Sequence, residues 1–183
     1  MTGLLRFIGL VNAAVWFGAA LFFTIAVGPA FFSDEMLAIF GSAQAPYSRA
    51  WAGLVAMVVL KRYFLWHYVC AAIGLVHLLA EAAYLGRPLA RWRTGLLLGI
   101  AVLGLSGGLW MQPKLKELHT AKYNPQLKAE ERAQAGVSFA VWHGVSQATN
   151  LLMTAGLLAF LWLSASHNSS EQRRPVSPFL YKA

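Results

Sequence analysis

The chain has 183 residues, of which 58% are hydrophobic and 12% are charged. Soluble domains carry about 25% charged residues, so this composition favours a single-domain polytopic membrane protein. The formal net charge of +8 could indicate nucleic acid as a partner. The placement of the basic residues argues against this, because they stand in connections between apolar segments and no aromatic platform accompanies them. We expect them to meet the anionic headgroups of a lipid bilayer. The single cysteine, Cys70, excludes an intramolecular disulfide framework and a multi-cysteine metal site.

The first apolar segment runs from about residue 4 to residue 31. It is about twice as long as the apolar part of a signal peptide and shows no small-residue cleavage site, so we expect it to be retained as a membrane span. We expect this span to break or end near Gly28-Pro29, because proline removes a helix donor.

A short interfacial helix is predicted between spans one and two, at about residues 34–40. Ser33 followed by two acids is typical of a helix start. The apolar segment 47–60 that comes next is too short to span alone, and Lys61-Arg62 interrupts it. It is either an interfacial helix or the protruding start of span two.

Span two, predicted at 63–85, gathers its polar side chains within about 100° of helix arc; they are His67, Cys70, His77, Glu81 and Tyr84. His77 and Glu81 form an i, i+4 pair, and ionisable groups inside a membrane are costly, which makes them candidates for a proton relay or a cation site. The alternative is structural: Glu81, near the helix end, reaches the interface or pairs with Arg87 or Arg6.

Span three, predicted at 92–112, contains small-xxx-small spacings, which let helix backbones approach closely. The glycines are Gly95 and Gly99, and Gly104 and Gly108. We expect close helix packing at Gly99 or Gly104. Pro113 is predicted to end the span, and the connection that follows is predicted to be partly helical with a break at Tyr123-Asn124-Pro125.

Span four, predicted at 136–163, carries the second polar seam, which we expect to face protein rather than lipid. Its members lie within about 100° of arc and are His143, Ser146, Gln147, Asn150 and Thr154. Thr149 lies outside this arc, and its hydroxyl is predicted to bond back to its own helix. Residues 1–163 therefore form one four-span domain, followed by a polar tail, 164–183, that is predicted to be flexible.

His67 and His143 each follow the start of a predicted span by a few residues, and the two spans run in the same direction. At one depth on facing seams, two imidazoles are the ligands that haem b or copper would use. The other interpretation is that the two rings make structural hydrogen bonds or line a small-molecule site. No metal or cofactor is predicted unless the haem or copper alternative holds.

With four spans, both termini lie on the same side of the membrane. Seven of the 15 basic residues fall on that side and eight on the other, which gives no decision by the positive-inside rule. The arginines near residues 87–93 favour the side of the termini as cytoplasmic, and the inner membrane of a bacterium is the predicted location.

The sequence contains no nucleophile elbow, phosphate loop, dinucleotide fingerprint or zinc-protease motif. Several segments instead resemble the domain-of-unknown-function 4149 family, which includes the transmembrane-protein-205-like proteins. They are the Trp110-Met111-Gln112-Pro113-Lys114 end of span three, the Trp142-His143-Gly144-Val145-Ser146 stretch with Asn150-Leu151, the Tyr63-Phe64-Leu65-Trp66-His67 opening of span two, and the Gly28-Pro29-Ala30 end of span one.

The resemblance implies a four-span membrane protein without an assigned reaction or catalytic residue. We therefore expect a non-enzymatic protein, either an accessory or assembly subunit that packs against other membrane subunits or a copy of itself, or a module that handles a small solute. The competing hypothesis is a haem- or copper-binding redox or transfer protein that uses His67 and His143.

Overall fold

The structure, a computed structural model, describes residues 2–41, 47–85 and 91–172, and every regular element in these residues is helical. In chain order they are α1 (Thr2–Phe22), the π-helical turn η1 (Phe23–Val27), α2 (Gly28–Ala30), α3 (Asp34–Ile39), α4 (Ser48–Leu85), α5 (Arg91–Ser106), the π-helical turn η2 (Gly107–Met111), α6 (Gln112–Tyr123) and α7 (Ala129–Gln172).

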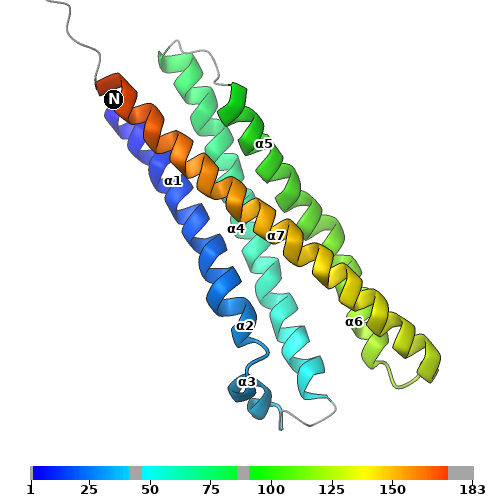
Figure 1. Ribbon diagram of the computed structural model, residues 1–183. Coiled ribbons are helices and arrows are strands. Elements are labelled where there is room, and N and C mark those ends of the chain that lie inside the picture. Colours follow the sequence, from blue (N-terminus) through cyan, green and yellow to red (C-terminus); the bar gives the residue numbers. More distant parts are fainter. Residues whose placement is uncertain (1, 42–46, 86–90, 173–183) are drawn as a thin grey trace, which may run out of the picture.

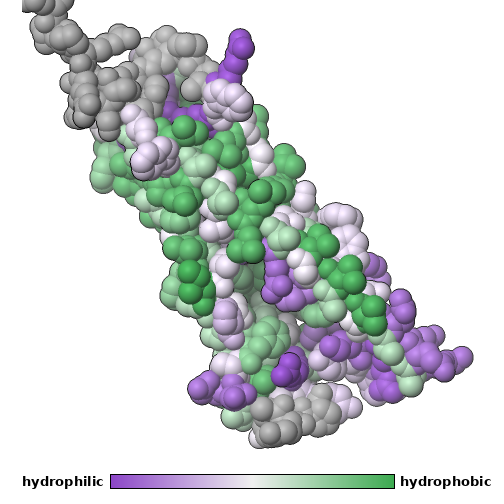
Figure 2. Space-filling view, viewed as in Figure 1, coloured by the Kyte–Doolittle hydropathy of each residue, from purple (hydrophilic) through white to green (hydrophobic). Residues whose placement is uncertain are grey.

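Four continuous helical stretches are long and apolar enough to cross a membrane. They are Gly3–Ala30, Ser48–Tyr84, Arg91–Tyr123 and Ala129–Ser166. Large apolar side chains on all four face outward, among them Phe7, Val76, Val102, Leu152 and Trp162, and Figure 2 shows hydrophobic residues over much of the visible side of the bundle. Such exposure suits lipid contact. This confirms the all-α, four-span membrane bundle.

The helices extend beyond their predicted limits. Helix α4 has 38 residues and begins at Ser48, so it is about 57 Å long against a hydrocarbon core of about 30 Å. Of the two interpretations of segment 47–60, the protruding start of span two is therefore correct. Lys61 and Arg62 lie within the helix with exposed side chains. Helix α7 continues to Gln172, so a tail beginning at 164 is wrong for its first residues; residues 173–183 lie outside the described chain.

The helix continues through Pro113, whereas the first span ends at Ala30, directly after Pro29. A π-turn precedes each one: the backbone N–H of Gly28 bonds to the carbonyl of Phe23 just before Pro29, and that of Gln112 bonds to the carbonyl of Gly107 just before Pro113. The wider turn accommodates a proline, which cannot donate to the preceding turn. The prediction that span one breaks or ends near Gly28-Pro29 is thus confirmed. The predicted end at Pro113 is wrong, because the helix continues into α6, and the predicted break at Tyr123 is confirmed as the end of α6.

The short helix between spans one and two is present as α3. The Ser33 hydroxyl accepts a hydrogen bond of 3.3 Å from the backbone N–H of Met36, as expected of an N-cap. Gly41 follows the helix at φ 122°, a conformation that glycine adopts without a side-chain clash. The Ser48 hydroxyl donates a 3.2 Å hydrogen bond to the carbonyl of Phe40, which ties α3 to the start of α4.

The buried core lies in one half of the bundle. Its members from α1, α4, α5 and α7 include Trp16, Cys70, Leu97, Ile100 and Leu157. In Figure 1 the start of α1 and the end of α7 lie together at one end of the bundle, while at the opposite end α6 and the start of α7 lean away from α3 and the start of α4. This divergence leaves space between the helices, and the candidate site lies there.

Candidate binding cavity

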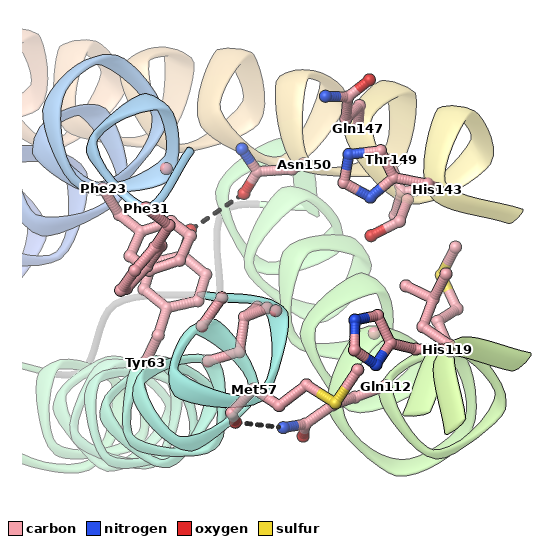
Figure 3. A pocket seen from close by; sticks show the side chains of 18 of the residues that line it. Phe23, Phe31, Met57, Tyr63, Gln112, His119, His143, Gln147, Thr149 and Asn150 are labelled. Atoms are coloured by element: carbon pink, nitrogen blue, oxygen red, sulfur yellow. Dashed lines mark hydrogen bonds between the residues drawn. The ribbon is translucent and has the colours of Figure 1, made fainter. Parts of the chain in front are cut away.

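A cavity of about 740 Å³ lies where the helices diverge. Its walls come from η1 and α2, from the first half of α4, from the end of α5, from η2 and α6, and from the first half of α7, as the close-up in Figure 3 shows. Ligand pockets in proteins typically have volumes of about 300–1,000 Å³. Both π-turns contribute residues to the wall, including Phe23 and Gly107, which agrees with the frequent placement of π-turns at functional sites.

The polar seam predicted on span four lines this cavity. His143, Ser146, Gln147 and Asn150 all belong to its wall. Thr149, placed outside the seam by the helical arc, also lines it, although its hydroxyl bonds back to the Val145 carbonyl at 2.9 Å as predicted. The seam therefore borders the cavity, although His143 and Gln147 remain exposed. Figure 3 shows its side chains above those of α4 and α6.

A hydrogen-bonded chain joins three helices beside the cavity. The Tyr63 hydroxyl donates to the side-chain oxygen of Asn150 at 2.9 Å, and the Asn150 amide donates to the Thr24 hydroxyl at 2.7 Å. The Thr24 hydroxyl in turn donates to the carbonyl of Ala20 at 2.8 Å. Since each member has a partner, the chain fixes α1, α4 and α7 relative to one another at low energetic cost for burying polar groups.

The wall from α6 was not identified from the sequence. Gln112 donates to the backbone carbonyl of Met57 at 3.1 Å, and the ring of His119 packs where a Cβ on Gly53 would stand. His119 is buried although it is polar. The signal that would have revealed this wall is the spacing of Gln112, Leu115, His119 and Lys122, which places all four on one helix face.

An aromatic row connects α6 to α7 across the cavity. The ring of Phe139 lies 5.7 Å from that of His119 and 5.6 Å from that of His143, on which it stacks. The ammonium group of Lys122 lies 5.1 Å from the centre of the Tyr123 ring and 5.7 Å from that of Phe139. Distances of this size allow cation–π attraction, so Lys122 is held beside the cavity wall to which it belongs.

The structure does not bring His67 and His143 together. A Cβ on Gly104 would lie 3.9 Å from the Cβ of His67 and 4.0 Å from the sulfur of Met153. His67 thus lies level with Met153, about ten residues or 15 Å further along α7 than His143. The prediction of equal depth is wrong because α4 begins well before residue 63.

The surroundings of His67 satisfy one of its two ring nitrogens. The indole N–H of Trp16 donates to Nδ1 of His67 at 2.6 Å, and the imidazole is 1% exposed. Since an indole N–H can only donate, Nδ1 accepts and the proton of the neutral ring stands on Nε2, which is buried without a hydrogen-bond partner among the described residues. Within the described chain, no three His, Cys, Asp or Glu side chains come together as a metal site.

His77 and Glu81 lie in a buried polar cluster at the other end of the bundle. An Arg93 nitrogen lies 2.8 Å from a Glu81 oxygen, and another lies 3.5 Å from Nδ1 of His77. Nε2 of His77 lies 2.8 Å from the carbonyl of Leu5 and 3.8 Å from Glu81. Glu81 thus pairs with Arg93, which was not among the partners expected from the sequence. One of the expected partners, Arg87, lies outside the described residues. Tyr84, the last member of the predicted stripe, is exposed.

The glycines of span three differ in their surroundings. Added Cβ atoms at Gly95 and Gly99 would meet nothing within 4 Å, and one at Gly104 would make only ordinary contacts. At Gly107 and Gly108 an added Cβ would overlap the Phe64 ring, and at Gly108 also the Tyr68 hydroxyl. Close approach to another helix of this chain therefore occurs at Gly107 and Gly108. The prediction that Gly99 packs closely against another helix of the same chain is wrong.

Comparison with known proteins gives one family. No curated protein and no solved structure matches the chain. A family model described as "Domain of unknown function (DUF4149)" matches residues 11–124, which run from within span one to the end of span three and stop before α7. The family carries no assigned activity, and the similarity noted for span four lies outside the matched residues. Because the match covers more than half of the chain, this four-span membrane protein belongs to the DUF4149 family.

Proposed function

We propose that this protein is a non-enzymatic membrane protein that binds a small organic molecule in the cavity between α2, α4, α6 and α7. The observation that carries the proposal is the position of the polar seam: the hydrogen-bonding groups of α7 line a cavity of about 740 Å³ whose opposite walls are largely apolar. A few polar groups on an otherwise apolar wall are typical of small-molecule sites.

Filling the cavity tests the proposal. Ser146→Trp would place an indole in the cavity, whereas Ala148→Trp would place it on the opposite, exposed face of α7. We expect the wild-type protein and Ala148→Trp, purified in mild detergent, to retain a small molecule that native mass spectrometry detects, and Ser146→Trp to lose it. Equal retention by the two variants, or no retained molecule and no thermal stabilisation of the wild type by lipid-soluble compounds, contradicts the proposal.

A second candidate function is that of an accessory subunit. The observation that favours it is the open space beside Gly95 and Gly99 on α5, since small residues on an exposed membrane helix suit close packing with another helix. Native mass spectrometry also separates the two candidates. A bound polypeptide or a second copy of the chain that is lost in Gly99→Leu supports the accessory subunit. A monomer that carries only a small molecule supports the binding module.

We further propose that the protein lies in the inner membrane of a bacterium with both termini in the cytoplasm. Arg91 and Arg93, at the same end of the bundle as the start of α1, support this orientation. In a Cys70→Ala background, Thr2→Cys and Lys128→Cys mark the two ends. We expect a membrane-impermeant maleimide added to spheroplasts to label only Lys128→Cys; labelling of only Thr2→Cys indicates the reverse orientation.

A further inference from the structure

The cavity is positively charged at one end. Arg49 from α4 and Lys122 from α6 both line it, and none of its described lining residues is Asp or Glu. Within the described chain neither cation forms an ion pair; Lys122 contacts aromatic rings, and the Arg49 side chain is exposed. Two cations without a counter-charge at the rim of an otherwise uncharged pocket favour an anionic group in the ligand.

The other end of the cavity is apolar. Leu103 and Met153 contribute to its wall there, together with Phe23 of η1 and Phe64 of α4. The polar groups nearest to this end, Tyr63 and Asn150, already bond to each other. The cavity therefore offers charge at one end and apolar surface at the other.

The length of the cavity can be judged along α4. Arg49 and Tyr63 both line it, and the helix between them rises about 21 Å at 1.5 Å per residue. One leaflet of a bilayer, half of a hydrocarbon core of about 30 Å, accommodates an acyl chain in about 15 Å. The cavity thus has room for one acyl chain and its headgroup, and its volume lies within the usual range for small-molecule ligands.

We propose that the ligand is a single-chain anionic amphiphile, namely a long-chain fatty acid. Its carboxylate lies between Arg49 and Lys122, and its chain extends past Tyr63 toward Leu103 and Met153. The inference rests on the proposed function, because it names the ligand of the same cavity. Lys and Arg pair with carboxylates through charge-assisted hydrogen bonds, and the apolar end removes the chain from contact with water.

The test compares an acid with an alcohol of the same chain. The full-length protein in nanodiscs is titrated with the fluorescent fatty acid cis-parinaric acid and with the corresponding alcohol. We expect the acid to bind at least tenfold more tightly than the alcohol. Arg49→Gln and Lys122→Gln should each weaken binding of the acid about tenfold and leave binding of the alcohol unchanged, since a charge-assisted contact is lost in each case.

The control variant is Lys116→Gln on the exposed face of α6, outside the cavity wall, which should change neither affinity. The fatty-acid inference is overturned if the acid and the alcohol bind equally well and if neither Arg49→Gln nor Lys122→Gln changes their binding. In that case the proposed function still stands when Ser146→Trp abolishes binding of both compounds. Displacement of the acid by a two-chain anionic phospholipid at lower concentration than by unlabelled oleate also overturns it. Binding that Ser146→Trp leaves unchanged contradicts the proposed function itself.

Discussion

The indole N–H of Trp16 on α1 donates a 2.6 Å hydrogen bond to Nδ1 of His67 on α4, and both side chains are 1% exposed. The imidazole also packs edge-on against the ring of Tyr63, with 4.5 Å between ring centres. This hydrogen bond satisfies Nδ1 of the buried imidazole, whereas Nε2 has no hydrogen-bond partner among the described residues. His67 fixes α4 against α1.

We expect Trp16→Phe to lower the free energy of unfolding by about 1–3 kcal/mol, because it leaves Nδ1 of His67 buried without a donor. Trp162→Phe, on a side chain that is 71% exposed, is the matched control and should have little effect. The double variant Trp16→Phe/His67→Phe should cost less than the sum of the single changes. Thermal unfolding in detergent measures these three variants and the single variant His67→Phe. If the losses of the two single changes add up to that of the double variant, the hydrogen bond contributes no coupling energy.

The ion pair between Arg93 and Glu81 gives a second prediction. Both side chains are at least nine-tenths buried, so Arg93→Met leaves a buried carboxylate without its partner and should cost about 3–5 kcal/mol. Arg91→Met, on an exposed neighbour, is the control. Adding Glu81→Met to Arg93→Met should recover a large part of the loss, because no unpaired charge then remains. If the double variant unfolds as readily as Arg93→Met, loss of the ion pair is not the cause of the lower stability of Arg93→Met.

Much of the architecture could be predicted from single residues and their spacing. The length of the apolar segments predicts the four spans, and Ser33 with two acids predicts α3. The arc of His143, Ser146, Gln147 and Asn150 predicts a seam turned away from lipid. These features depend on one helix at a time. The structure confirms the four spans and α3, and the four seam residues line the cavity, although His143 and Gln147 are exposed.

Relations between helices could not be predicted in the same way. The depth of His67 relative to His143 depends on how far each helix protrudes, and α4 begins 15 residues before the predicted start at 63. The partner of Glu81 comes from α5, beyond a loop whose path the sequence does not specify. The cavity exists because two helix pairs diverge, and a divergence angle leaves no periodic signal in the sequence.

The acid at the start of α3 gives a prediction for pH. The pKa of the Glu35 carboxyl lies below its ordinary value because the carboxylate accepts a hydrogen bond from its own backbone N–H, with a smaller contribution from the Ser33 side chain. A depressed folded-state pKa stabilises the folded helix above the unfolded value of about 4.3, and this contribution disappears as the pH falls through the lower, folded value.

Carbon-detected NMR titration of Glu35 should therefore give a midpoint below about 4.3. In Ser33→Ala the midpoint should rise and yet remain depressed, since the backbone hydrogen bond is the larger cause. Loss of the cap should also make α3 exchange its amide protons faster at neutral pH. A wild-type midpoint at or above the ordinary value contradicts the prediction.

The glycines of α5 and η2 give the last prediction, which separates packing within the chain from packing between chains. Gly108→Ala should destabilise the protein by about 1–3 kcal/mol, because its Cβ overlaps the Phe64 ring and the Tyr68 hydroxyl. The Cβ of Gly99→Ala would meet no atom of the described residues within 4 Å, and alanine favours a helix over glycine by up to about 1 kcal/mol. The monomer should therefore be unchanged or more stable. Thermal unfolding at two protein concentrations measures both effects: a loss of stability in Gly99→Ala that appears only at the higher concentration would mean that Gly99 packs against a second copy of the chain.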